Sequence, residues 1–285
     1  MTHYAFKKVI LLNLFCLVMF PGYINAKSSD KDELEVSLRV KNFSYKEISS
    51  NNQVLNKEDG PVPGLGMIYY EQYGNVQMQL EAALYDGVVD YTGQTQGGSP
   101  ITTRSDTTFA ELNFFVTRWM NQQSDLKLGI YAGLGYNYWK RNIRSTTTTL
   151  GAPVSGLLEK YLIGYGSIGA KIKYLTSERS TLSLDLRASK ILKADVDVDF
   201  LGTGGFDNAS LSIGKKQGYR VALPWEKKLS HNSSIVISPY YEFWEFGLSN
   251  TKELTINGSP SGTNVFEPES ETSNYGVNFS FRQDF

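Results

Sequence analysis

Strict alternation of apolar and polar residues is the feature that most limits what this chain can fold into, and residues 126–138 show it most clearly. Apolar side chains stand at every second position there: Leu126, Leu128, Ile130, Ala132, Leu134, Tyr136 and Tyr138. Lysine, glycine and asparagine fill most of the positions between them. A period of two residues is that of an extended strand whose two faces differ in polarity. We therefore expect a sheet with one apolar face and one polar face.

Ten segments carry this pattern, and the connections between them alternate between long and short along most of the chain. The long polar connections are expected at residues 48–62, 92–106, 144–157 and 250–270, with a shorter one at 202–208. Outer-membrane barrels have an even number of strands, short turns at the periplasmic end and long loops outside, whereas a soluble sandwich has no reason to sort its loops by length. We predict an all-β fold for residues 27–285: a ten-stranded antiparallel transmembrane β-barrel. Several strands exceed the roughly 9 to 11 residues that cross a membrane, so we expect the wall to rise above the outer leaflet.

The last strand closes this barrel against the first one. Its apolar positions are Tyr275, Val277, Phe279, Phe281 and the terminal Phe285. A strand that ends in this way resembles the assembly signal of bacterial outer-membrane barrels, although Gln283 stands where that signal usually has an apolar residue. The resemblance implies barrel-assembly machinery as a partner.

Aromatic residues fall near both ends of the predicted strands. Those at the turn side are Tyr73, Trp119, Tyr174, Trp225 and Phe285, and those at the loop side are Tyr91, Trp139, Tyr161, Phe246 and Tyr275. Amphipathic rings settle at membrane interfaces, so we expect two outward-facing girdles.

Residues 1–26 are expected to be a secretory signal that is cleaved after Ala26. Lys7 and Lys8 precede an apolar stretch at 9–20, which also contains the only cysteine, Cys16. Beyond residue 26 no apolar run approaches the roughly 20 residues of a membrane-spanning helix. The chain has 28 basic and 29 acidic residues, and this near balance argues against nucleic acid as a partner.

Extending the alternation to the polar face places charges of both signs inside the barrel. The predicted lumen residues are Glu81, Glu111, Asp185, Glu242, Lys127, Lys171, Arg187, Arg220 and Arg282. Opposite charges can pair there, and at ten strands the lumen is little wider than the side chains that fill it. We interpret the network as a plug, and a narrow conduit for small solutes is the alternative.

The number of strands, the tall wall and the order of loops resemble those of the omptins, a family of outer-membrane surface proteases. Local likeness lies in Glu111-Leu112-Asn113, in a strand that ends at Trp119, and in Leu128-Gly129-Ile130-Tyr131-Ala132-Gly133. The resemblance implies a peptide-cleaving site at the outer rim, where an Asp pair on one wall faces an Asp-His pair on the other and water is the nucleophile.

The residues at those places differ from the omptin pattern. The outer end of the seventh strand holds Asp195, Asp197 and Asp199 without a histidine, and the other wall offers Asp86 and Asp90, four residues apart rather than two. The only histidine beyond the signal is His231, in a predicted periplasmic turn. Water attack at neutral pH needs a base poised near that pH, which an ordinary carboxylate is not. We therefore predict no enzymatic activity.

The three aspartates need an interpretation of their own. Period two puts Asp195, Asp197 and Asp199 on one face, which the parity of the strand predicts to be the lumen face. Like charges about 7 Å apart repel unless they are solvated or bridged by a cation. A solvated rim, a loose calcium site and a contact with a ligand all remain open.

The sequence thus favours a monomeric, non-enzymatic barrel in the bacterial outer membrane, exported through the periplasm. Its expected surroundings are membrane lipid and lipopolysaccharide, and its loops are expected to contact an extracellular ligand that the sequence does not name. Two alternatives remain, a narrow porin-like channel and an omptin-like surface hydrolase with an altered acidic site.

Overall fold

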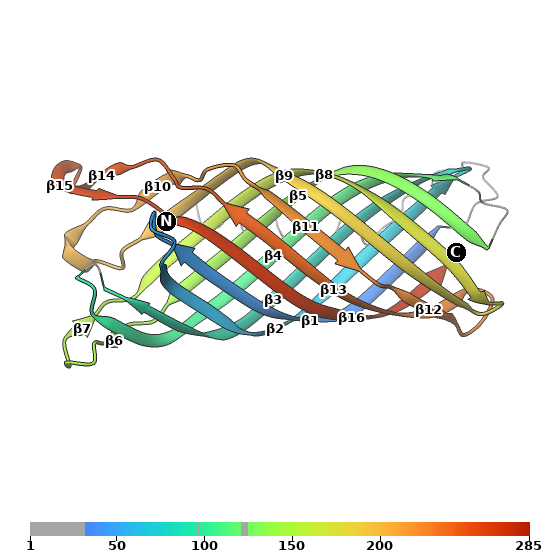
Figure 1. Ribbon diagram of the computed structural model, residues 1–285, viewed down its shortest axis with the longest axis horizontal. Helices are drawn as coiled ribbons and strands as arrows, with labels where there is room; N and C mark the ends of the chain where they lie inside the picture. The colour runs from blue at the N-terminus through green and yellow to red at the C-terminus, as the bar shows by residue number, and fades with distance from the viewer. Residues whose placement is uncertain (1–31, 96, 121–124) are drawn as a thin grey trace. The chain divides into compact units, whose positions relative to one another are not determined.

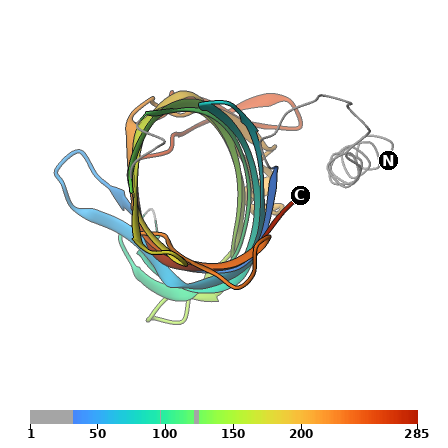
Figure 2. The same cartoon turned by 90° about the vertical axis from the view of Figure 1, so that its right-hand side faces the viewer.

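The computed structural model describes residues 32–95, 97–120 and 125–285, so the predicted signal at 1–26 lies outside the described residues. Within the barrel unit, one antiparallel sheet closes on itself, because β1 (Glu33–Ile48) pairs along its whole length with β16 (Glu269–Asp284). The view from the turn end shows this closed ring (Figure 2). In these ranges no helix is long and apolar enough to cross a membrane.

Ten wall positions make up the ring, which confirms the predicted ten-stranded antiparallel barrel (Figure 1). Between β1 and β16 the unbroken strands are β2 (Val54–Tyr73), β3 (Val76–Gln94), β4 (Pro100–Met120), β5 (Leu126–Ile143), β8 (Leu157–Ser177), β9 (Ser180–Asp199) and β13 (Ser233–Phe246). Three short strands share the remaining position: β10 (Ala209–Ser212), β11 (Gln217–Ala222) and β12 (Trp225–Lys228). Outside the ring lie two small hairpins, β6 (Thr146–Thr147) with β7 (Pro153–Val154) and β14 (Lys252–Ile256) with β15 (Ser259–Val265), and the single-turn helix η1 (Thr203–Gly205).

The strands begin earlier and end later than the alternation predicts. β2 starts at Val54 and β4 at Pro100, so most of the predicted loops 48–62 and 92–106 is strand, and the predicted loop 250–270 contains the β14–β15 hairpin. The prediction was wrong there because these segments stand above the lipid. Both faces of a strand can carry polar residues in that region, so the pattern fades while the backbone ladder continues.

The outer surface of the wall separates into an apolar lower band, here called the belt, and a polar upper wall. On β5 the outward-facing residues from Leu126 to Tyr136 are apolar, and Lys140 follows on the same face. On β16 the outward face is apolar from Phe281 to Tyr275, and Glu271 follows. The belt thus matches the roughly 9 to 11 residues that a tilted strand needs to cross a membrane.

An outward aromatic girdle exists at the upper edge of the belt, but most of its members differ from those predicted. Tyr91, Trp139, Tyr161 and Phe246 point into the barrel and are buried, and only Tyr275 of the predicted loop-side set is exposed. The exposed rings at the level where apolar residues give way to polar ones are Tyr136, Tyr219, Tyr241 and Tyr275. The prediction failed because an aromatic ring near a strand end suits a filled lumen as well as an interface.

Candidate functional site

The lumen within the belt is filled by ion pairs and hydrogen bonds between side chains of different strands. Arg39 Nη1 lies 2.8 Å from Glu81 Oε1, and Lys41 Nζ lies 3.0 Å from Glu111 Oε1. Further around the ring, Arg220 pairs with Glu242 at 3.5 Å, Tyr131 donates to Asp185 at 2.6 Å and Lys171 donates to Gln79 at 2.8 Å. The Arg187 guanidinium lies over the Phe115 ring, 4.6 Å from its centroid. Charges of both signs therefore meet inside the barrel, and two of the pairs involve Arg39 and Lys41, which were not among the predicted lumen residues.

Arg282 forms a second group of pairs near the turn end of the lumen. It lies 2.8 Å from Glu35 and 3.4 Å from Glu33 on β1, and 2.9 Å from Glu226 on β12. Arg282 itself belongs to β16, so one guanidinium ties the last strand to the first across the closing seam and to a third wall position. Lys127, which has the same parity as the lumen residues, is exposed at this end.

Above the ion pairs the interior is a packed aromatic layer, here called the aromatic plug: Phe43, Phe109, Trp139, Tyr161, Tyr165 and Trp244. The Trp139 ring stacks on Tyr161 with centroids 4.5 Å apart, and the Phe43 and Phe109 centroids are 5.2 Å apart. Between the plug and the ion pairs lies a cavity of about 20 Å³, room for one water molecule. The barrel is therefore filled at both levels.

A group of four glutamates surrounds one arginine above the plug; we call it the Arg141 cluster, comprising Arg141, Glu47, Glu58, Glu159 and Glu267. Arg141 lies 2.8 Å from both Glu58 and Glu159 and 3.0 Å from Glu47. All five residues are less than 9% exposed. Glu267 accepts hydrogen bonds from the Tyr161 hydroxyl at 2.7 Å and the Tyr45 hydroxyl at 3.1 Å.

The carboxyl of Glu267 is unusual because it lies on the connection between β15 and β16, not on a wall strand. Burial and the nearby carboxylates of Glu159 and Glu47 raise the pKa of Glu267 well above its ordinary value, against the opposing effect of Arg141. The Glu267 side chain is sealed inside the wall, so a substrate outside the barrel does not reach it.

Asp195, Asp197 and Asp199 face outward, and their predicted place in the lumen is wrong. Opposite Gly164 and Tyr165 the register shifts between Lys193 and Ile191, which leaves Leu192 as a bulge. The extra residue reverses the parity, so Val196 and Val198 point inward and the aspartates point to solvent.

Each of the three carboxylates has a separate partner. Asp195 accepts from Ser212 and pairs with Lys193, Asp197 accepts from the Ser210 hydroxyl, and Asp199 accepts from the Leu201 amide. Within residues 32–95, 97–120 and 125–285, no three acidic, histidine or cysteine side chains come together as a metal site would need. The calcium hypothesis therefore rests on the spacing of the aspartates alone.

The other wall of the expected acidic site also faces outward. Asp86 accepts from the Thr108 hydroxyl at 2.7 Å, and Asp90 lies 3.8 Å from Arg104. His231 is exposed in the turn between β12 and β13, at the opposite end of the barrel from the loops. The acids of the rim and the histidine thus do not meet.

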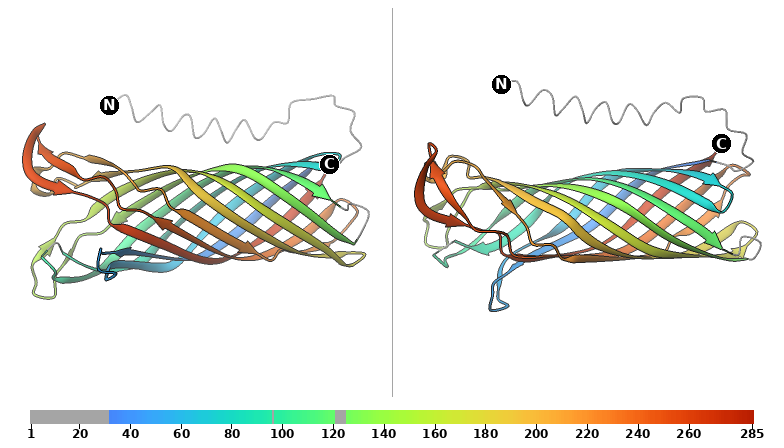
Figure 3. Two further views of the ribbon diagram at one scale, coloured as in Figure 1. Left: turned by 45° about the horizontal axis from the view of Figure 1, so that its top comes forward. Right: turned by 90° about the horizontal axis from the view of Figure 1, so that it is seen from above.

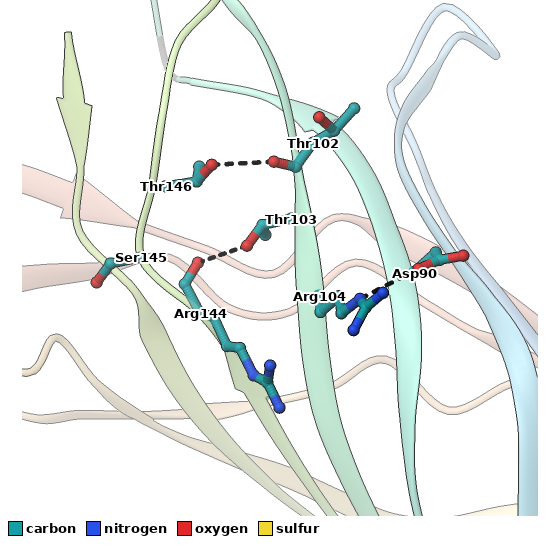
Figure 4. Close-up of a pocket in the computed structure, with 7 residues that line it drawn as sticks. All are labelled: Asp90, Thr102, Thr103, Arg104, Arg144, Ser145 and Thr146. Carbon is teal, nitrogen blue, oxygen red and sulfur yellow. Dashed lines mark hydrogen bonds and ion pairs between the residues drawn. The ribbon is translucent and has the colours of Figure 1, made fainter. Parts of the chain in front are cut away.

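Asp90 belongs to an open groove of about 320 Å³ on the outer rim (Figure 4). Its lining residues come from β3, β4 and the start of the β5–β8 connection: Asp90, Thr102, Thr103, Arg104, Arg144, Ser145 and Thr146. The Thr103 and Thr146 hydroxyls donate to the carbonyls of Arg144 and Thr102, and Arg144 pairs with Asp106. The lining of the groove is therefore polar, and these hydroxyls and charges pair with neighbours on the rim.

The closing strand places Tyr275, Phe279, Phe281 and Phe285 on the lipid side, with exposed fractions of about half or more, and Val277 half-buried on the same face. β16 pairs with both β13 and β1, and the Phe285 amide donates to the Asp32 carbonyl at 2.9 Å. The predicted assembly signal therefore lies on a strand that stays paired with both neighbouring strands up to its C-terminal residues.

Comparison with known proteins supports the fold through structure alone. The outer membrane protease OmpT from Escherichia coli has a TM-score of 0.63 to this chain, is 12% identical, and the match covers 92% of this chain and 99% of OmpT. The fold is that of an outer-membrane β-barrel. No family model matches the chain, and no curated protein matches its sequence.

Two further solved barrels match at lower TM-scores. OprG from Pseudomonas aeruginosa has a TM-score of 0.39 and 11% identity, with coverage of 90% of this chain and 96% of OprG. The toluene transporter TodX from Pseudomonas putida has a TM-score of 0.36 and 10% identity, with coverage of 90% and 91%. The ten-stranded, omptin-like layout predicted from the order of loops is confirmed by the likeness to OmpT, while at these identities the comparison shows the fold alone.

Sequence reasoning missed the Arg141 cluster entirely. Its carboxylates come from β1, β2, β8 and the β15–β16 connection, and three of them, Glu47, Glu58 and Glu267, lie within or beside segments expected to be loops. The one available signal was Arg141 itself. On β5 the alternation is clear, and it places Arg141 on the inward face together with Trp139, two residues earlier.

Proposed function

We propose that this protein is a non-enzymatic outer-membrane barrel whose sealed interior supports extracellular loops that contact a partner. The observation that carries the proposal is the filling of the lumen, by ion pairs within the belt and by the aromatic plug above it, with a cavity of only about 20 Å³ between them. A wall filled in this way is stiff and offers no continuous path to solutes.

Several parts of the proposal follow from the sequence. The chain is exported with residues 1–26 as its signal, is inserted by barrel-assembly machinery and works as a monomer among lipid and lipopolysaccharide. The polar partner meets the loop end, where the groove of Asp90, Arg104 and Arg144 and the β14–β15 hairpin are exposed.

Conductance in planar bilayers tests the proposal against the channel alternative. The purified barrel should show no steady openings under conditions in which an open porin in the same bilayer conducts. Steady openings whose size changes in Glu111→Gln, on the lumen side, but not in Asp86→Asn, on the outer wall, would establish a conduit and refute the plug.

The hydrolase alternative is favoured by the likeness of the fold to that of OmpT, and a peptide digest tests it. Lipopolysaccharide-loaded protein incubated with a mixture of peptides should leave them intact. Cleavage that Asp197→Asn abolishes would overturn the non-enzymatic proposal and assign the acidic rim a catalytic role.

A further inference from the structure

The β14–β15 hairpin is fastened to the barrel at two places. Near its tip, Asp207 accepts from the Thr255 hydroxyl at 2.6 Å and from the Gly258 amide at 2.8 Å. At its base, the Ser212 amide of β10 donates to the Asn250 side-chain oxygen at 2.7 Å, and the Asn250 amide donates to the Ser212 carbonyl at 3.1 Å. Beside Asn250, hydrogen bonds between Ser249 and Glu267 join the two legs of the hairpin to each other. Figure 3 shows the hairpin at the loop end of the barrel. The two attachments hold it against the mouth.

The base of the hairpin continues into the interior through the Glu267 side chain, which joins the Arg141 cluster. Tyr45 from β1 and Tyr161 from β8 donate to the same carboxyl oxygen, Oε1. These contacts link the hairpin to two wall strands on separate parts of the ring. Docking of the hairpin therefore depends on keeping the Glu267 carboxyl inside.

The charges around Glu267 do not balance when all its neighbours are ionised. Glu47, Glu58 and Glu159 share the single guanidinium of Arg141, and Glu267 adds a fourth carboxyl. The Glu58 Oε2 atom is buried and has no hydrogen-bond partner among the described residues. Buried like charges repel strongly because water does not screen them. The titratable and charged groups that face Glu267 are Tyr45, Glu47, Arg141, Glu159 and Tyr161, while Glu58 and Tyr91 face Arg141 in the same cluster.

We propose that Glu267 is a proton-dependent latch, which is docked in the Arg141 cluster when its carboxyl is protonated and expelled, together with the hairpin, when it is ionised. The proposal goes beyond the proposed function, because it concerns movement of the loops and holds whether or not the lumen conducts. It stands on the buried position of a loop carboxyl among three wall carboxylates and one arginine.

The direction of the pH dependence follows from the environment of the carboxyl. In the docked state the pKa of Glu267 is raised, whereas in the released state the side chain is in water and has its ordinary pKa. The docked state then binds more protons, so its stability is full below the ordinary glutamate pKa and is lost as pH rises through the raised one. The hydrogen bonds to Asp207 hold its pKa below the usual value, so the attachment near the hairpin tip stays ionised over this range.

Distance measurement between two spin labels tests the latch. One label is placed on the hairpin through Ser259→Cys and the other on the outer wall of β3 through Thr92→Cys, both exposed positions. Cys16, the only native cysteine, lies in the predicted signal and is expected to be removed with it. At about pH 5 we expect one narrow distance distribution, and at about pH 9 a second, broader component from released hairpins. In Glu267→Gln, which keeps an acceptor for the tyrosines but carries no charge, the narrow distribution should persist at the higher pH.

Matched variants keep the test decisive. Glu269→Gln removes a carboxylate two residues away that pairs with exposed Lys216, and it should leave the pH response unchanged. Glu47→Gln removes one of the charges that raise the pKa of docked Glu267, so the docked and released pKa values lie closer together. The fraction of released hairpins at the higher pH should therefore fall, even if Glu267→Gln does not fold. A distribution that is identical at both pH values in the parent would refute the latch, as would loss of the response in Glu269→Gln. If calcium restored the docked distance at the higher pH, a metal ion would compensate the buried carboxylates. That result would refute the proposal that protonation of Glu267 controls docking.

Discussion

Arg141 is the residue on which the upper lumen depends. Its guanidinium is fully buried and reaches carboxylates on three strands, β1, β2 and β8, and it also lies over the Tyr45 ring, 4.6 Å from the centroid. A buried arginine suits this place because its planar fork donates several hydrogen bonds at once and keeps its charge. The burial of the glutamates is tolerated only while that charge is present.

Removing the guanidinium should therefore be costly. In Arg141→Gln, Glu47, Glu58 and Glu159 lose their counter-charge inside the wall, and we expect a loss of about 3–5 kcal/mol in the free energy of unfolding. Urea titration in lipid vesicles, followed by tryptophan fluorescence, measures it. Arg144→Gln is the control, since Arg144 pairs with Asp106 at the exposed rim and should change stability little. Equal effects from both variants would contradict a special role for Arg141.

At the scale of the element, the bulge in β9 decides which chemistry the outer end of that strand presents. Without Leu192 as an extra residue, the acids would point into the lumen beside the aromatic plug. With it, the inward positions go to Val196 and Val198, which are almost completely buried, and the acids form a ladder against Ser210 and Ser212 of β10. One inserted residue thus exchanges an acidic interior for an apolar one.

The same ladder gives the calcium hypothesis its test. If a cation bridges Asp195, Asp197 and Asp199, calcium should raise the melting temperature of the barrel, and replacing all three aspartates by asparagine should abolish that rise without preventing folding. Heat-dependent mobility in gels reports both folding and melting. A melting temperature that calcium never changes would remove the hypothesis.

The whole molecule is organised by the border between the belt and the polar upper wall. On β1 the outward-facing Val36, Leu38 and Val40 are exposed apolar residues, and Asn42 and Ser44 continue the same face above them. Lipid covers such residues at little cost, while the polar positions need water. The same border separates the ion-paired lumen from the aromatic plug and the Arg141 cluster, so the lower barrel is built for lipid and the upper barrel resembles a soluble protein.

Because the belt faces lipid and the upper wall faces water, the cost of an added outward-facing charge in unfolding free energy depends on whether it stands within the belt or above it. Leu38→Arg, on the lipid face of the belt, should cost about 2–4 kcal/mol of unfolding free energy in vesicles. Ser44→Arg carries the same charge on the same face of the same strand, above the belt, and should cost little. Urea titrations of the two variants measure the difference. If both substitutions had the same effect, the belt would not mark the membrane.

The sequence by itself determined the features that depend on neighbours along one strand. Alternation in residues 126–138 and 275–285, together with the lengths of the connections, is enough to predict ten antiparallel strands and a closed ring. These follow because side chains alternate between the two faces with a period of two residues, which any single strand displays.

Only the tertiary structure decided where that period breaks and which residues meet across the lumen. The bulge at Leu192 reverses every later side chain in β9, and no local pattern marks it. The strand near Glu58 has polar residues on both faces, and near Asp90 the adjacent Val88 and Val89 put apolar residues on both faces, so neither extension was visible as alternation in the sequence. The Arg141 cluster joins positions as far apart in the chain as Glu47 and Glu267, and such a meeting is fixed by the closure and register of the ring, not by any property of the separate strands.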